Sequence, residues 1–139
     1  MTLYKSELEI KIPFHGLDPM NIVWHGNYIK YMEQARCDMF AKLKYTYHDM
    51  KNDNYAYPIA KMNTKFIKPA YFDEELIIKT YLQEIEPALN IKYEIFDKKT
   101  GEKIFEANTM QIGINMKTME SLYKAPKKLI ESLEKINEK

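Results

Sequence analysis

A single carboxylate lies shortly before a predicted helix start near the N-terminus of this 139-residue chain. Asp18 stands between Gly16 and Pro19, which favour an irregular loop, and Pro19 pushes Asp18 toward an extended conformation. A helix is predicted to begin near residues 25–27. The N–H groups at a helix start can hold the oxygen of a polarised carbonyl, and a carboxylate can attack that carbonyl or activate water. Taken alone, these residues also allow a simple Asp-Pro turn without chemistry.

The helix prediction rests on a change of hydrophobic period at Tyr28. From there, apolar side chains recur every three or four residues, which places them on one helical face. The residues on this face are Tyr28, Tyr31, Met32, Ala35, Met39 and Leu43. The pattern predicts a helix that ends near Lys44. The preceding run Ile22-Val23-Trp24 is predicted to anchor the loop in a core.

Residues 14–36 resemble the signature of hotdog-fold acyl-CoA thioesterases of the 4-hydroxybenzoyl-CoA thioesterase type. This family includes small bacterial enzymes associated with the Tol–Pal system. The matching pieces are, in chain order, Asp18-Pro19, Ile22-Val23-Trp24-His25, Asn27-Tyr28 and Glu33-Gln34-Ala35-Arg36. Two positions depart from the pattern: Gly16 replaces the first acid of the usual Asp-x-Asp, and Asn21 stands near the usual glycine. We expect these departures to affect loop shape and substrate range more than the type of reaction.

The resemblance implies a role for each matching residue. Asp18 is expected to act as nucleophile or general base, and His25 is the second candidate catalytic residue. The backbone N–H of His25, with that of Gly26, is expected to stabilise the developing oxyanion. The expected substrate-binding residues are Trp24, Asn27 and Tyr28, and the expected structural pair is Glu33 with Arg36. Separately, the nucleotide of coenzyme A needs a cationic surface, for which Lys65 is the expected binding residue, with Lys61 and Lys68 as further candidates.

The implied reaction is hydrolysis of an acyl-CoA or acyl-carrier-protein thioester to free acid and thiol. A thiol, with a pKa near 8.5, leaves with little acid assistance, so one carboxylate and one oxyanion site can suffice. Neither a cofactor nor a metal is expected, because coenzyme A is part of the substrate. The residues do not distinguish short, medium-chain or aromatic acyl groups.

Two other functions stay open. The same fold hosts enoyl-thioester hydratases and dehydratases, which pair a histidine with an acid, and Asp18 with His25 is such a combination. A non-catalytic acyl-thioester binding module would keep the pocket without needing a nucleophile. The helix that follows the Asp-Pro favours the thioesterase. The sequence has no Gly-x-Ser-x-Gly elbow, phosphate-binding glycine loop or His-Glu-x-x-His motif.

Composition is ordinary for one globular domain, with 45% apolar and 29% charged residues, so we predict a single domain over residues 1–139. A net charge of +1 gives no support for a nucleic-acid partner. No apolar run approaches the ~18 residues of a membrane span, and the first residues lack a signal-peptide layout. We therefore expect a cytoplasmic protein.

Cys37 and Arg36, both in the predicted helix, each lead to a separate prediction. Cys37 is the only cysteine and has no metal-ligand spacing around it, so a buried thiol is predicted. Arg36 is the only arginine among 21 basic residues. Because its planar fork differs from the lysine ammonium, we expect a fixed bidentate contact with Glu33 or with a second subunit.

Alternating side chains predict an antiparallel sheet around the helix. The predicted strands are residues 2–13, 58–68, 74–86, 88–97 and 102–116, and the last four are expected to form a meander. A shift of apolar phase between Ala107 and Met110 indicates a bulge. Residues 45–55 are predicted to form a connector or a lid over the pocket, and a short helix follows Ala125-Pro126.

The predicted architecture is thus the α+β hotdog fold, in which a five-stranded antiparallel sheet wraps one long central helix and a short C-terminal helix follows. Open sheet edges favour pairing. The resemblance implies a homodimer or homotetramer, with residues 60–68 contributing to pockets between subunits.

Overall fold

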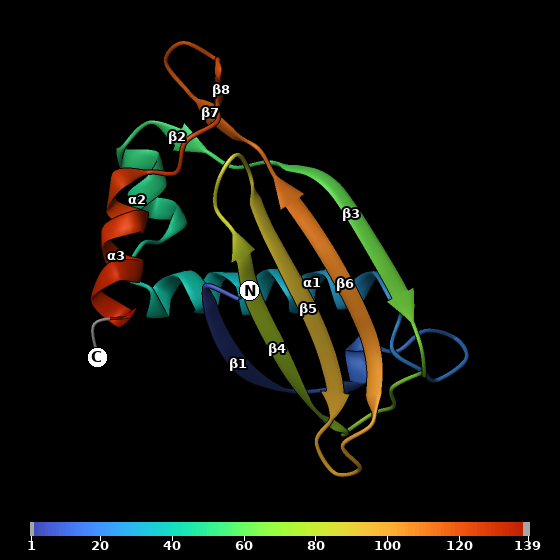
Figure 1. The fold of residues 1–139 in the computed structure, drawn as a ribbon. Helices are drawn as coiled ribbons and strands as arrows, with labels where there is room; N and C mark the ends of the chain where they lie inside the picture. The colour runs from blue at the N-terminus through green and yellow to red at the C-terminus, as the bar shows by residue number, and fades with distance from the viewer. Residues whose placement is uncertain (1, 138–139) are drawn as a thin grey trace.

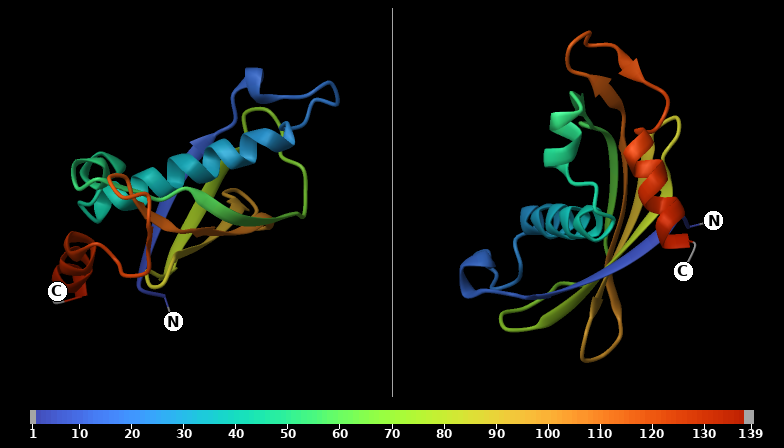
Figure 2. Two further views of the ribbon diagram at one scale, coloured as in Figure 1. Left: turned by 90° about the horizontal axis from the view of Figure 1, so that it is seen from above. Right: turned by 90° about the vertical axis from the view of Figure 1, so that its left-hand side faces the viewer.

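One long helix and a five-stranded antiparallel sheet form the body of the protein in the computed structural model, which describes residues 2–137. Helix α1 (His25–Lys42) crosses one face of the sheet, and the strands curve around it (Figures 1 and 2). The strands of this sheet are β1 (Tyr4–Lys11), β3 (Ile59–Phe66), β4 (Glu75–Glu84), β5 (Leu89–Asp97) and β6 (Lys103–Gln111). This arrangement confirms the α+β fold with a sheet wrapped around one central helix.

The strand order is β1-β4-β5-β6-β3, and every pair is antiparallel. Strands β4, β5 and β6 form a meander, but β3 pairs with β6 at the far edge instead of with β4. The predicted four-strand meander is therefore wrong for its first strand. The physical reason is that β1 already occupies the edge of β4, so β3 can join the sheet only beside β6.

The apolar face of α1 packs into the concave side of the sheet, as the hydrophobic period predicted. Met32, Ala35 and Met39 are fully buried and belong to one core cluster with sheet residues such as Ile78 and Ile91. Burying one large apolar side chain contributes about 1.5–3 kcal/mol. The helix ends at Lys42, two residues earlier than predicted.

The prediction of a buried Cys37 is wrong, because its side chain is exposed. Cys37 lies one turn after Glu33 and one turn before Ala41, and both of these residues are exposed. Residues four apart share a helical face. The cysteine therefore lies on the solvent side of α1, away from the sheet.

The prediction of a bulge between Ala107 and Met110 is wrong, because strand β6 is regular there. Its pairing with β5 runs without a break from Ala107 to Met110, and Phe105, Ala107, Thr109 and Gln111 are buried in strict alternation. The last two of these inward positions are polar. The apolar pattern therefore changes phase while the strand itself stays regular.

Smaller elements gather around the C-terminal end of α1 (Figure 1). Helix α2 (Tyr47–Asn52) follows α1 closely, and a small sheet joins β2 (Tyr55–Ala56), β7 (Gly113–Asn115) and β8 (Ser121–Leu122). Helix α3 (Lys127–Asn137) buries Leu129 and Leu133, and Lys128 Nζ lies 3.1 Å from Asp53 Oδ1 at the end of α2.

The position of α2 excludes a lid over this chain's own pocket. An 18-residue helix is about 27 Å long, and α2 lies at the opposite end of α1 from Asp18. Residues 45–55 therefore act as a connector within one chain.

None of the helices in the described part of the chain has both the length and the apolar character needed to cross a membrane.

Candidate active site

The carboxylate of Asp18 closes a tight loop. Its Oδ1 accepts hydrogen bonds from the N–H groups of Met20 at 2.8 Å and Ile22 at 3.4 Å, and the Asp18 N–H donates to the Ile22 carbonyl at 2.8 Å. Asn21 adopts a φ of 64°, a left-handed conformation that asparagine tolerates better than most residues. This explains how the loop forms without glycine at that position. Within residues 2–137, Asp18 Oδ2 accepts no hydrogen bond, so it is available to a ligand.

The loop is fixed to the segment that joins β3 and β4. The Val23 N–H donates to the Ala70 carbonyl at 2.9 Å, and Ile22 forms an isolated bridge with Tyr71. Val23 is buried, whereas Ile22 is partly buried and Trp24 is exposed, so only the middle residue of the predicted apolar run lies in the core. The C-terminal side of the Asp18 loop is thus held against this segment.

Helix α1 begins at His25 with an exposed set of backbone donors. Trp24 is the N-cap residue, and its side chain forms no capping hydrogen bond. The Asn27 N–H donates to the Trp24 carbonyl at 2.9 Å. In the described chain, the N–H groups of His25 and Gly26 have no partner, and no acidic residue lies in the first turn. This end of the helix therefore has a partial positive charge that no acidic residue of its own first turn balances.

A pocket of about 360 Å³ joins the Asp18 loop, the first turn of α1 and the end of β3. Its lining residues are Asp18, Met20, Ile22, Val23, His25, Tyr28, Phe66, Ile67, Lys68 and Pro69. Of the residues singled out in the sequence, Asp18, His25 and Tyr28 meet here. Most of the other lining residues are apolar, so the pocket suits a partly hydrophobic ligand.

Aromatic rings form one wall of the pocket. Tyr28 stacks on Phe105 with ring centroids 4.9 Å apart and an interplanar angle of 7°, and Phe66 meets Tyr28 edge-on at 5.6 Å. Burial raises the pKa of Tyr28 to about 12, so its phenol is neutral at physiological pH. Sequence analysis missed Phe66 and Phe105, which are register partners in β3 and β6. Only knowledge of that strand pairing would have revealed them.

Other predicted binding residues lie outside the pocket lining. The Asn27 side-chain amide donates to the Gly16 carbonyl at 2.9 Å, and the indole of Trp24 lies over the first turn of α1. Lys65 is exposed on β3 and lies next to Phe66, so strand alternation places the two side chains on opposite faces. Lys68 lines the pocket instead and forms an ion pair with Glu102.

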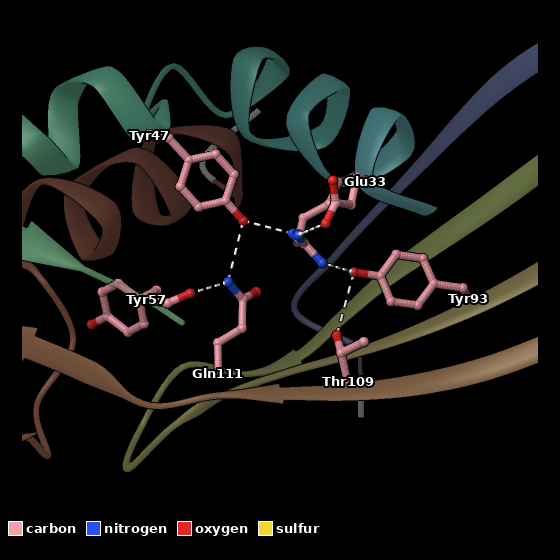
Figure 3. Close-up of polar contacts among 7 residues, drawn as sticks. Glu33, Tyr47, Tyr57, Tyr93, Thr109 and Gln111 are labelled. Carbon is pink, nitrogen blue, oxygen red and sulfur yellow. Dashed lines mark hydrogen bonds and ion pairs between the residues drawn. The ribbon is translucent and has the colours of Figure 1, made fainter. Parts of the chain in front are cut away.

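Arg36 is buried and binds Tyr47 and Tyr93, which are labelled in Figure 3. Its Nε donates to the Tyr47 hydroxyl at 2.6 Å and its Nη1 donates to the Tyr93 hydroxyl at 3.2 Å. Glu33 Oε1 lies 3.8 Å from Arg36 Nη2, and the Glu33 side chain is 61% exposed. The predicted bidentate contact with Glu33 is therefore wrong: one ion pair joins the two side chains, and the two hydrogen bonds of Arg36 go to tyrosines that sequence analysis did not identify.

The same cluster extends to β6. Thr109 Oγ1 donates to the Tyr93 hydroxyl at 3.3 Å, and Gln111 Nε2 donates to the Tyr57 carbonyl at 2.6 Å and to the Tyr47 hydroxyl at 3.3 Å. Burial raises the pKa of the Tyr47 and Tyr93 phenols. These contacts join α1, α2, β5 and β6 (Figure 3). Because the cluster lies beyond the middle of α1, away from Asp18, we assign it a structural role.

A larger hollow of about 620 Å³ lies between residues 72–75 and 97–100. Two of its acidic groups are in ion pairs: Asp73 lies 3.2 Å from Lys11, and Glu75 lies 3.2 Å from Lys98. Asp97 Oδ1 accepts the N–H of Lys99 at 2.8 Å. The smaller pocket, which contains an available carboxylate and free helix N–H groups, is therefore the better candidate site. No group of three or more potential metal ligands occurs among the described residues.

Fold and site together define a member of a known enzyme class. The model of the thioesterase-like superfamily matches residues 12–133, so the chain belongs to that family of thioester hydrolases. This confirms the resemblance noted in residues 14–36.

Individual relatives agree with that class. The structure of a DHNA-CoA thioesterase from Staphylococcus aureus is similar with a TM-score of 0.84 and 28% identity, over 96% of this chain and 91% of that one. YneP of Bacillus subtilis is 24% identical over 121 residues, which are 86% of this chain and 87% of YneP. The acyl-CoA thioesterase YbgC of Helicobacter pylori is 24% identical over 87 residues, 63% of each protein.

Proposed function

We propose that this protein hydrolyses an acyl-CoA thioester to a free acid and coenzyme A. The observation that supports this most directly is that Asp18 and the uncapped start of α1 border one pocket. The relatives named as DHNA-CoA and acyl-CoA thioesterases support the choice of a coenzyme A thioester.

In the proposed reaction, the thioester carbonyl oxygen accepts hydrogen bonds from the N–H groups of His25 and Gly26. The carboxylate of Asp18 either attacks the carbonyl carbon, to form an anhydride that water then opens, or removes a proton from an attacking water. In both routes the carbon–sulfur bond breaks and the thiolate leaves with the bonding electrons. The helix N–H groups stabilise the negative oxygen of the tetrahedral intermediate.

The acyl group would lie against the apolar wall. Tyr28 and Phe66 line the pocket beside His25, and Phe66 is 51% exposed. Because both rings are large and nonpolar over most of their area, they favour an apolar or aromatic acyl group over a charged one. An acyl-carrier-protein thioester presents the same reacting group and is the alternative substrate.

The free edge of β3 supports a homo-oligomer, either a dimer or a tetramer. Among residues 2–137, strand β3 pairs only with β6, and nearly all of its residues are exposed. Unpaired edges tend to pair with another chain. A second copy on this edge would lie beside Phe66 and Ile67, which both line the pocket.

The test is release of free thiol from a panel of acyl-CoA compounds by the wild type and by Asp18→Asn. Asparagine keeps an oxygen that can accept the Met20 and Ile22 hydrogen bonds, so the loop should persist without its base. We expect hydrolysis to fall by about 100-fold or more. Because Cys37 is exposed and would react with thiol reagents, both proteins should contain Cys37→Ser.

Near-normal hydrolysis by Asp18→Asn would contradict the assigned role of the carboxylate. If the folded wild type releases no thiol from any compound, hydration of enoyl-CoA is the next assay, because it tests the hydratase alternative. Binding of acyl-CoA without either reaction would indicate the non-catalytic module.

A further inference from the structure

The side chain of Asn27 connects the first turn of α1 to the chain just before Asp18. Asn27 Nδ2 donates to the Gly16 carbonyl at 2.9 Å, and the Trp24 N–H donates to the same oxygen at 3.0 Å. Two donors from the helix start therefore converge on one carbonyl, which lies two residues before the carboxylate.

The connection continues to the carboxylate through short contacts. Leu17 forms an isolated bridge with Val23, and the Asp18 N–H donates to the Ile22 carbonyl at 2.8 Å. Gly16 is itself buried. A Cβ at position 16 would lie 3.4 Å from Asn27 Nδ2, so the amide fills the space beside the glycine. The loop has little room to move relative to the helix while this contact exists.

We propose that Asn27 is a positioning residue that fixes the separation between the Asp18 carboxylate and the free N–H groups of His25 and Gly26. This inference rests on the proposed hydrolysis. The carboxylate must reach the carbonyl carbon, or a water beside it, while the oxyanion donors hold the carbonyl oxygen, and a displacement of about 1 Å can lower a rate by about 100-fold. Asn27 is absent from the pocket lining, so it acts through the loop and not on the ligand.

The role differs from the substrate-binding role that the sequence suggested, and kinetics distinguish the two. A positioning residue alters kcat because it changes geometry in the reacting complex, whereas a residue that binds the substrate alters KM. Asn27→Ala removes the donor, and Asn27→Asp keeps the size of the side chain while placing a carboxylate oxygen against the Gly16 carbonyl.

The experiment measures kcat and KM of both variants with the acyl-CoA that the wild type hydrolyses fastest. We expect kcat to fall by about 10- to 100-fold with KM changed less than about twofold. Gln34→Ala is the matched control, because it removes an exposed amide from the same helix and should leave both constants unchanged. Emission from Trp24, the only tryptophan, checks that each variant keeps the fold of the site.

A rise in KM with unchanged kcat would overturn the inference and assign Asn27 to substrate binding. Unchanged kcat in both variants would also overturn it. In either case the loss of hydrolysis in Asp18→Asn would still support the proposed function, so the two hypotheses fail separately. If Asn27→Ala does not fold, the size-matched Asn27→Asp decides the outcome.

Discussion

The indole ring of Trp24 lies directly against the backbone of Gly26. A Cβ at position 26 would come within 2.4 Å of two ring carbons, which is closer than any real contact. The ring also lies beside the imidazole of His25, with centroids 5.2 Å apart. Trp24 therefore covers one side of the helix start that provides the proposed oxyanion donors, and only glycine leaves room for it.

Replacing Gly26 with alanine should displace the indole. We expect a change in tryptophan emission and slower thioester hydrolysis, because the helix start becomes more open to water. Stability should change by less than about 1 kcal/mol, since alanine favours the helix. Fluorescence, urea unfolding and thiol release measure the three effects. Unchanged emission together with unchanged hydrolysis would show that the ring has no influence on the site.

His25→Ala should slow hydrolysis less than Asp18→Asn does. The backbone N–H at position 25 remains in the variant, so the proposed oxyanion contact survives the loss of the imidazole. The comparison uses kcat/KM for the same acyl-CoA. An equal loss in both variants would instead mean that the imidazole takes part in the chemistry.

Arg36→Lys should destabilise the protein. The shorter lysine side chain, with one nitrogen, cannot keep both guanidinium hydrogen bonds to Tyr47 and Tyr93, so at least one buried hydrogen bond to a charged donor is lost. We expect a loss of about 2–3 kcal/mol in the free energy of unfolding, measured with urea. Lys30→Ala, on the exposed side of the same helix, is the control and should change stability by less than about 0.5 kcal/mol.

Removing the Asp49 carboxylate should reduce stability in a pH-dependent way. Asp49 Oδ2 accepts hydrogen bonds from the Thr46 N–H at 2.9 Å and the Thr46 hydroxyl at 3.0 Å, and these lower the pKa of Asp49 below its usual 3.8. A lowered pKa in the folded state stabilises the protein above the unfolded pKa, and this contribution disappears as the pH falls through the lowered value.

Urea unfolding of the wild type and of Asp49→Ala tests the sign of this effect. At neutral pH the variant should be less stable. Well below pH 3.8 the gap should narrow, because the carboxyl group is then protonated in both folded and unfolded wild type. A gap of equal size at both pH values would contradict the stabilising role assigned to the Thr46–Asp49 hydrogen bonds.

The exposed edge of β3 predicts self-association. Size-exclusion chromatography with light scattering should give at least twice the monomer mass, and dilution that dissociates the oligomer should lower specific activity. A fully active monomer would show that each pocket is complete within one chain.

The sequence by itself determined the local elements. The hydrophobic period located α1 to within two residues, because residues three or four apart lie on the same face of a helix and are buried together. Alternation likewise located the strands, and Asp18-Pro19 identified the loop. The exposure of Cys37 was also readable in principle, since Glu33 and Ala41 share its helical face.

Only the tertiary structure decided which of these elements meet. A strand pattern states which side chains are buried but not which strand lies alongside, so the pairing of Phe66 with Phe105 could not be predicted. For the same reason, the polar residues Thr109 and Gln111 at inward positions led to the wrong prediction of a bulge. The structure shows that they face inward because they bind the tyrosines of the Arg36 cluster. Partners far apart in sequence come together through packing of the whole chain, and local periodicity has no information on that packing.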